Sequence, residues 1–167
     1  GNLAGRKNTI GYENVFIGFQ AGYDNITGAK NTFIGDSAGL LNIKGRENVS
    51  IGYQAGFKNT GGAYNTNIGV NSGYNVTVGT GNVCIGYQAG FSNITGIQNV
   101  FIGYTAGSNE TGNNKLYIAN SDTTTPLIYG EFDNKTLNIN GALTLNGTNS
   151  LSPLGFKQPS AIGTVGA

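Results

Sequence analysis

The sequence predicts an all-β protein, a parallel β-solenoid or β-roll of 17-residue coils. The dipeptide Ile-Gly recurs at that interval from Gly18 to Gly103, and columns of Asn, Ala and Gly keep the same register without insertion or deletion. Apolar residues alternate from Val15 to Tyr23, which is typical of a strand. Helix–turn–helix repeats need more than about 30 residues, and three glycines per unit disfavour a helix.

Each unit is expected to form a short strand, a glycine corner, a second short strand around residues 25–27, and another corner. Coils of this kind stack with about 4.8 Å between strands, so residues 17 apart lie over one another. The Ile and Ala columns are expected to fill the interior, and the Asn side chains to hydrogen-bond to each other along the axis. The predicted structural ladders are Ile17, Ile34, Ile51, Ile68, Ile85 and Ile102, and Asn14, Asn31, Asn48, Asn65, Asn82 and Asn99.

Aromatic residues form further columns, which either cover the surface of the roll or lie at an interface between copies. Phe19, Tyr53, Tyr87 and Tyr104 share one column, Tyr23, Phe57, Tyr74 and Phe91 a second, and Phe16, Phe33 and Phe101 a third. Three slender rolls packed about a common axis would bury aromatic surface that a single roll leaves exposed. The side chains of Gln20, Gln54 and Gln88, together with the first aromatic column, are candidates for contacts with glycans.

The chain is expected to have three parts. Residues 1–112 form about six and a half repeats, residues 113–147 a short-strand cap or shaft segment, and residues 148–167 an extended linker or arm. Strand patterns and turn signals place strands at 115–121, 126–132, 136–140 and 142–145. A cap is needed because the open end of a solenoid exposes unpaired N–H and C=O groups.

The composition argues against several classes of function. Among 167 residues there is no His and a single Cys, 10% are charged, and the net charge is +1. The expectation is therefore a protein that is not an enzyme and has no metal, no cofactor and no nucleic-acid partner. No apolar run reaches the roughly 18 residues of a membrane helix, so the chain is not expected to insert into a membrane. Cys84 is expected to be a buried, inert thiol.

The acidic residues offer few candidates for chemistry. Glu13 and Glu47 share a column two coils apart, at a solvent-facing corner beside Lys30 and Arg46. We interpret them as solvated charges rather than a catalytic pair. Asp122, Glu131 and Asp133 are also interpreted as solvated turn charges, with cation binding as the alternative.

The segment from Asn48 to Gly56, Asn-Val-Ser-Ile-Gly-Tyr-Gln-Ala-Gly, resembles the head repeat of trimeric autotransporter adhesins. Similar arrays occur in phage tail fibres and in fibres of phage-like injection devices. The resemblance covers roughly residues 1–112 and implies a left-handed β-roll with three chains per head. The adhesin family favours small residues before Ile-Gly, where this chain has Phe16, Phe33 and Phe101. The later succession Leu-Tyr-Ile, Pro-Leu-Ile-Tyr-Gly-Glu-Phe and Leu-x-Ile-Asn-Gly, within residues 116–141, is similar to segments that join repeat regions to shafts in tail-fibre-like proteins, where short strands from three chains often form a β-prism.

The function expected is structural: a homotrimeric fibre segment of a phage tail or phage-like contractile injection device, which serves host attachment through a surface glycan or protein. Alternatives are the head of a bacterial trimeric surface adhesin and a self-stacking extracellular filament subunit. All three place the chain outside the cell, on a virion, an injection particle or a bacterial surface.

Overall fold

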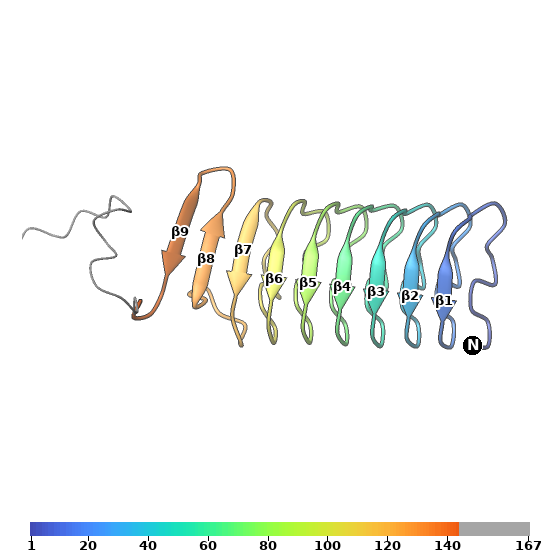
Figure 1. The fold of residues 1–167 in the computed structure, drawn as a ribbon, viewed down its shortest axis with the longest axis horizontal. Coiled ribbons are helices and arrows are strands. Elements are labelled where there is room, and N and C mark those ends of the chain that lie inside the picture. Colours follow the sequence, from blue (N-terminus) through green and yellow to red (C-terminus); the bar gives the residue numbers. More distant parts are fainter. Residues whose placement is uncertain (144–167) are drawn as a thin grey trace, which may run out of the picture.

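The structure, a computed structural model, describes residues 1–143, which form a single nine-stranded sheet along one axis (Figure 1). The strands pair in the order of the sequence, and this part of the chain contains no helix. They are β1 (Val15–Ile17), β2 (Thr32–Ile34), β3 (Val49–Ile51), β4 (Thr66–Ile68), β5 (Val83–Ile85), β6 (Val100–Ile102), β7 (Lys115–Ile118), β8 (Ile128–Glu131) and β9 (Thr136–Ile139).

The pairing of the strands changes from parallel to antiparallel at the C-terminal end of the sheet. Strands β1 to β7 are parallel, and the register from β1 to β6 pairs residues 17 apart, Ile17 with Ile34 and so on to Ile102. The step from β6 to β7 is one residue shorter, because Ile102 pairs with Ile118. Strands β8 and β9 then continue the sheet in antiparallel pairing. The parallel β-solenoid predicted from the repeat is confirmed. Its last parallel step, from β6 to β7, is 16 residues long and not 17.

The glycine after each Ile makes the corner that ends the strand. Gly35 has φ +133°, and a Cβ added there would lie 2.5 Å from the carbonyl oxygen of Gly52 in the next coil. An L-residue neither favours this backbone conformation nor fits this close approach of two backbones. The corner therefore requires Gly at this position of every coil.

The interior of the roll is filled by the column that precedes Ile. Phe33, Cys84 and Phe101 are fully buried in this inner column, as expected for the Cys84 thiol, and Ser50 and Asn67 are almost fully buried. The Ile ladder was expected inside, and that expectation is wrong: Ile17 is 55% exposed and Ile102 is 36% exposed. The period-two pattern identifies two faces but not which one points inward. The Ala column is buried as expected.

Each coil of the roll contains one strand and not two. The expected strand around residues 25–27 is absent, because the N–H groups of Ile26 and Thr27 both donate to the carbonyl of Ile43, at 3.1 and 2.9 Å. Irregular backbone thus stacks from coil to coil. The alternating stretch also ends as a strand at Ile17, and residues 19–24 form turns.

The segment after Gly112 contains three of the four expected strands, each shorter than its sequence pattern suggests. Residues 142 and 143 belong to no strand, and residues 144–145 lie outside the described part. The predicted linker at 148–167 also lies outside the described residues.

Candidate functional site

The outward side of the sheet is mostly aliphatic, with Thr32, Thr66 and Gly130 as the exceptions, and we call it the aliphatic face. The registers place Leu116 and Ile118 of β7 opposite Val100 and Ile102 of β6, and the same alternation continues through β9. None of its residues is charged: Val15, Ile17, Thr32, Ile34, Val49, Ile51, Thr66, Ile68, Val83, Ile85, Val100, Ile102, Leu116, Ile118, Ile128, Gly130, Leu137 and Ile139.

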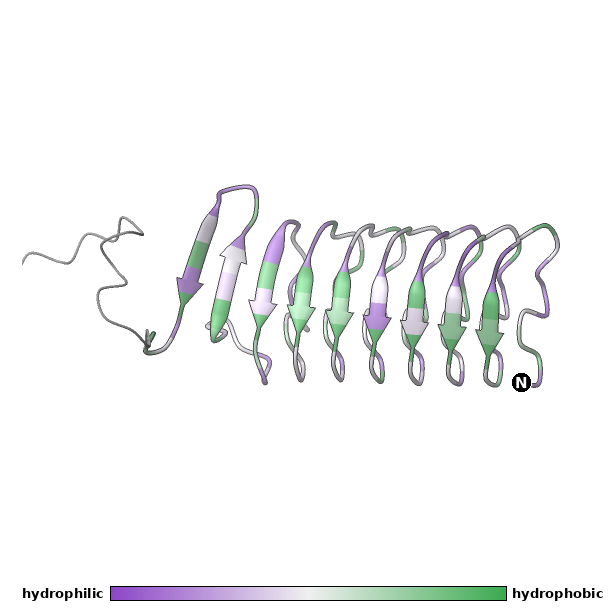
Figure 2. Ribbon diagram, in the orientation of Figure 1, coloured by the Kyte–Doolittle hydropathy of each residue, from purple (hydrophilic) through white to green (hydrophobic). Residues whose placement is uncertain are grey.

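The outward side of this sheet lacks the charged residues of an ordinary half-buried sheet, and its inner side is mixed. Its inner column includes Ser50 and Asn67, while every Ile stands on the outward side, half-buried or exposed. In Figure 2 the strands of the roll are largely hydrophobic, except that β4 is partly hydrophilic. Sheets with one wet face normally direct polar residues to that face. Large exposed apolar patches are in general the surfaces at which proteins bind partners.

The predicted Asn ladder forms a continuous hydrogen-bonded column. The Oδ1 atom of Asn31 accepts bonds from the backbone N–H of Asn48, at 3.0 Å, and from its Nδ2, at 3.1 Å. The same Nδ2 donates to the carbonyl oxygen of Gly62, at 2.8 Å. Similar contacts join Asn14 through Asn99, all but Asn14 buried, and the N–H of Lys115 closes the column on Asn99 Oδ1 at 2.8 Å. The ladder thus satisfies backbone groups that each corner leaves unpaired.

A second Asn column, buried except at Asn8, was not singled out in the sequence, although its regular spacing is visible there. It contains Asn8, Asn25, Asn42, Asn59 and Asn93, with Val76 in the remaining position. Asn25 donates to Asn8 Oδ1 at 2.8 Å and Asn42 to Asn25 Oδ1 at 2.6 Å. These side chains also bond glycine backbone groups three residues later.

The aromatic columns lie in three different environments. Phe33 and Phe101 are interior, so their assignment to a surface or interface is wrong. Phe57, Tyr74 and Phe91 are half-buried and stack face to face, with ring centroids 5.0 and 5.3 Å apart. The candidates Phe19, Tyr53, Tyr87 and Tyr104 are exposed beside the aliphatic face, and the rings of the last two stack at 5.1 Å. Face-to-face stacking covers the ring surfaces that a sugar would use.

The candidate Gln residues occupy a strained corner. Gln20, Gln54 and Gln88 have φ between 52° and 53°, in the left-handed region, and are half-buried. The N–H of Gln54 donates to the carbonyl of Asp36, at 2.9 Å, in the preceding coil. They therefore have a structural role at the corner, whether or not they bind a ligand.

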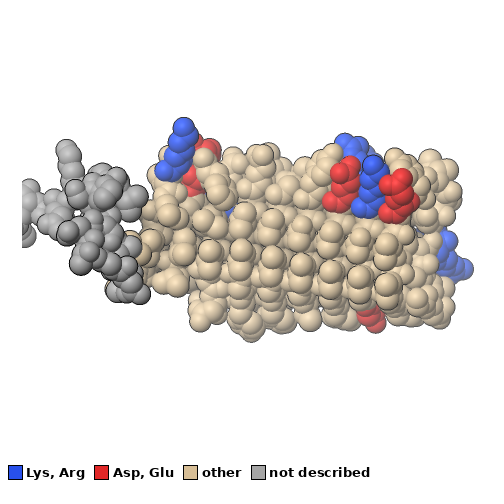
Figure 3. Space-filling view, viewed as in Figure 1, with Lys and Arg blue, Asp and Glu red and all other residues tan. Residues whose placement is uncertain are grey.

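Charges are confined to the two ends of the described chain. Residues 59–109 contain no Lys, Arg, Asp or Glu. In Figure 3 the visible face carries charge over the N-terminal coils and near β8, with none between. Glu13 and Glu47 are exposed, as expected, at left-handed corners with φ 55° and 56°.

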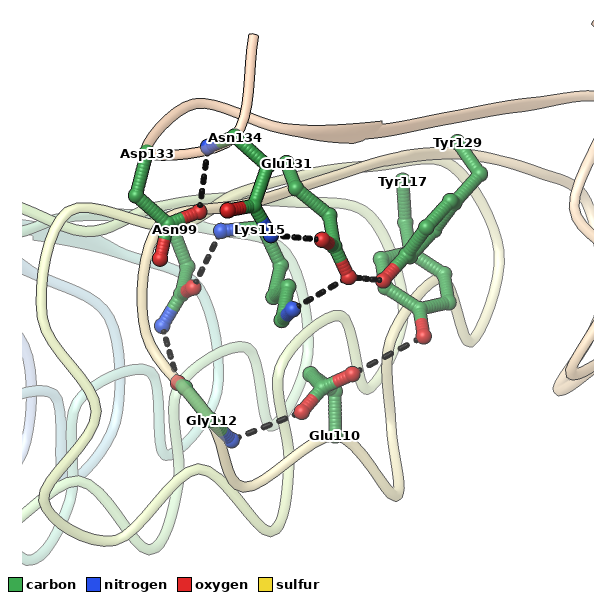
Figure 4. A network of polar contacts seen from close by, with 9 residues as sticks. All are labelled: Asn99, Glu110, Gly112, Lys115, Tyr117, Tyr129, Glu131, Asp133 and Asn134. Atoms are coloured by element: carbon green, nitrogen blue, oxygen red, sulfur yellow. Dashed lines mark hydrogen bonds and ion pairs between the residues drawn. The ribbon is translucent and has the colours of Figure 1, made fainter. Parts of the chain in front are cut away.

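A polar network joins β7 to β8 (Figure 4). The Nζ of Lys115 donates to Glu131 Oε1 at 2.7 Å, the Tyr129 hydroxyl donates to the same oxygen, and Asn134 donates to Oε2. These donors, Lys115 first, lower the pKa of Glu131 to about 2, and Glu131 raises the pKa of Lys115. Glu131 was expected to be a solvated turn charge and instead forms an ion pair. The pairing depends on the antiparallel register of β7 and β8, which places Lys115 opposite Glu131 and which no repeat in the sequence reveals.

A hollow of about 290 Å³ lies where the roll meets this hairpin. Its lining combines the corner before β7 with the connection from β7 to β8. The lining residues are Gly107, Asn109, Glu110, Thr111, Tyr117, Asp122, Thr123 and Thr124. The hydroxyl of Tyr117 donates to Glu110 Oε2 at 2.8 Å, and Asn109 Nδ2 donates to Asp122 Oδ2 at 2.6 Å.

Within residues 1–143, no three His, Cys, Asp or Glu side chains gather as metal ligands would, and no helix is present that could cross a membrane. Comparisons with known protein families, curated proteins and solved structures find no match to the chain.

Proposed function

We propose that the chain is a structural, non-enzymatic segment of an extracellular fibre, assembled as a homotrimer, that serves host attachment on a phage tail or phage-like contractile injection device. The observation that carries this proposal is the aliphatic face, whose side chains are half-buried or exposed in the single chain and include no charged residue over nine strands. The stacked coils supply the second requirement, a stiff rod (Figure 1).

The size of the aliphatic face supports a second copy as its cover. Eight strand spacings of about 4.8 Å give the two aliphatic columns, about 7 Å apart, a length of about 38 Å. The flanking column of Phe19, Tyr53, Tyr87 and Tyr104 also contains Asp36 and Val70, and it runs beside β1 to β6 only, over about 24 Å. The resulting area of about 430 Å² is within the range of the largest apolar patches, which are often functional. A stable interface buries about 800 Å² per partner, which this face would supply together with flanking residues. Cyclic symmetry closes such a contact without leaving free faces.

The oligomeric state tests the proposal. Light scattering on the purified chain should give three times the single-chain mass of 17.3 kDa. Ile68→Asp places a charge in the middle of the aliphatic face and should reduce the mass to that of one chain. Ile94→Asp makes the same change at an exposed residue outside the sheet and should leave the trimer intact.

Circular dichroism distinguishes dissociation from unfolding, and Ile68→Ser offers a milder change if Ile68→Asp fails to fold. A wild-type mass equal to that of one chain, or equal behaviour of the Ile68 and Ile94 variants, would overturn the trimer.

The head of a bacterial trimeric surface adhesin is the second candidate, favoured by the motif from Asn48 to Gly56. It uses the same trimer. A membrane anchor or tail-tube genes encoded beside this segment would distinguish the two.

A further inference from the structure

The hollow beside β7 is the open end of the interior of the roll. Tyr117 continues the inner column, since it pairs with Phe101 in the sheet register. Glu110 follows Asn93 by one repeat in the second Asn column, and accepts a hydrogen bond from the N–H of Gly112 at 2.7 Å as Asn59 does from Gly62. After Ile118 the described chain reverses into β8 and completes no further coil over these residues.

The change at position 110 replaces a neutral amide with a carboxylate. The complete coils place Asn or Val at this position of the interior, and only the last one places an acid there. Across the hollow, Asp122 supplies a second carboxylate. Neither acid is in an ion pair, because the salt bridges of residues 1–143 join Lys7 to Asp24 and Lys115 to Glu131. No Lys or Arg lines the hollow.

This lining defines the chemistry of a ligand. Two carboxylates and an amide accept hydrogen bonds from neighbouring hydroxyl groups, three Thr hydroxyls donate or accept, and Tyr117 contributes a ring. The negative charge repels anions. A volume of about 290 Å³ is at the lower end of ligand sites, which fits one small ring. Glu110 and Asp122 already accept bonds from Tyr117 and Asn109, an arrangement less suited to a bare cation than to a hydroxyl network.

We propose that this hollow binds a single neutral saccharide unit, a hexose or N-acetylhexosamine, of a surface polysaccharide. Tyr117 lies on the inner side of the sheet, opposite the aliphatic face, so packing of copies through that face leaves the hollow accessible. The proposal deepens the attachment function and rests on it for multivalency, because three hollows per trimer raise a weak affinity by avidity. All eight lining residues of the hollow belong to one chain.

Ligand-observed saturation-transfer NMR on the intact chain tests the proposal with galactose, glucose, mannose and N-acetylglucosamine as probes. Glucuronate provides a charged counterpart of glucose. Asp122→Ala removes an acceptor from an exposed loop residue. Asp133→Ala is the matched control, since it removes an exposed carboxylate that does not line the hollow.

At least one neutral probe should bind the wild-type chain and the Asp133→Ala variant. Asp122→Ala should weaken that binding by about tenfold or more, the effect of losing a hydrogen bond to a charged group. Glucuronate should not bind. The proposal is overturned if none of the four sugars binds, if Asp122→Ala binds as the wild type does, or if calcium alone binds in an Asp122-dependent manner. Because binding is measured per chain and mass separately, failure here is distinguishable from failure of the trimer.

Discussion

The coils of the roll have two kinds of interior. At the N-terminal end Phe16 and Phe33 pack with the Ala column, and at the C-terminal end Phe101 packs with Cys84 and Tyr117. Between them Ser50 and Asn67 belong to no hydrophobic cluster, and neither amide atom of Asn67 has a hydrogen-bond partner. Yet β3 and β4 keep the same strand length and register as β2.

The comparison teaches that the glycine corners and the Asn ladder determine the shape of a coil, while the inner side chain sets how much stability it contributes. The two interiors should therefore respond alike to changes in the corners and differently to changes in the inner column.

The corner glycines should give the largest effect, equal in both regions. Gly35→Ala and Gly69→Ala each place a Cβ 2.5 Å from the carbonyl oxygen of the next coil, at φ +133° and +127°. We expect each to lower the free energy of unfolding by about 4 kcal/mol or more. Urea denaturation at a fixed chain concentration measures it. Gly61→Ala, where the Cβ meets only the flexible Lys44 side chain at 3.0 Å, is the control. A small loss at Gly69 would show that the corner matters less where the interior is polar.

Substitutions in the inner column should change the free energy of unfolding by different amounts in the two regions. Phe33→Ala leaves a cavity in a fully buried site and should cost about 3–5 kcal/mol. Asn67→Ala removes an amide without partners and should cost less than about 1 kcal/mol. Asn67→Leu should raise the free energy of unfolding by about 1 kcal/mol, because it replaces a buried unsatisfied amide with an apolar group. Thermal unfolding compares all three, and equal losses for the two alanine variants would contradict the distinction.

The Asn ladder should contribute in the polar-cored region as strongly as elsewhere. Asn65→Ala leaves the N–H of Asn82 and the carbonyl of Gly79 without their partners, which lie at 3.0 and 2.7 Å. The expected loss is about 2–3 kcal/mol, the cost of unsatisfied buried groups. Asn31→Ala, in the Phe-cored region, should lose a similar amount in the same urea titration. If Asn31→Ala alone were costly, the ladder would depend on the Phe interior.

The smallest effect concerns acid and the β7–β8 ion pair. The pKa of Glu131 is lowered from 4.5 to about 2, so its stabilising contribution is present above pH 4.5 and is lost as the pH falls toward 2. The protection of β8 amides against hydrogen exchange, measured relative to their intrinsic rates at each pH, should fall over that window, while β2 and β4 stay protected. Glu131→Gln should remove the pH dependence, and Asp133→Asn, an exposed neighbouring acid, should leave it. Uniform loosening of all strands would contradict a local role for the pair.

Much of the roll follows from the sequence. Because one unit closes one coil, the 17-residue register of Ile and Asn predicts the parallel pairing from β1 to β6. Which side of the strand faces inward does not follow from period two alone. The inner column mixes Phe, Ser, Asn and Cys, so it looks less like a core than the Ile column does, and the expectation chose the wrong side.

The end of the roll could not be predicted in the same way. The missing residue between β6 and β7 breaks the register on which the column argument depends. The hollow and the Lys115–Glu131 pair arise from the reversal into β8, a tertiary feature without a repeat to reveal it. The replacement of Asn by Glu110 in its column was visible in the sequence. That Glu110 and Asp122 line one hollow could be seen only in the fold.

Distances between spin labels test most directly the central claim that each repeat unit makes one coil. Ile10→Cys and Thr95→Cys are five coils apart in one exposed column, and Cys84 stays unlabelled because it is fully buried and its thiol pKa is raised to about 12. Labelled chains are mixed with an excess of unlabelled chains so that only distances within one chain are measured. Double electron–electron resonance should then give about 24 Å between the Cα positions, from five steps of about 4.8 Å. The pair at 10 and 78 should give one step less. Distances that do not grow by one step per repeat unit would contradict the stacked coil.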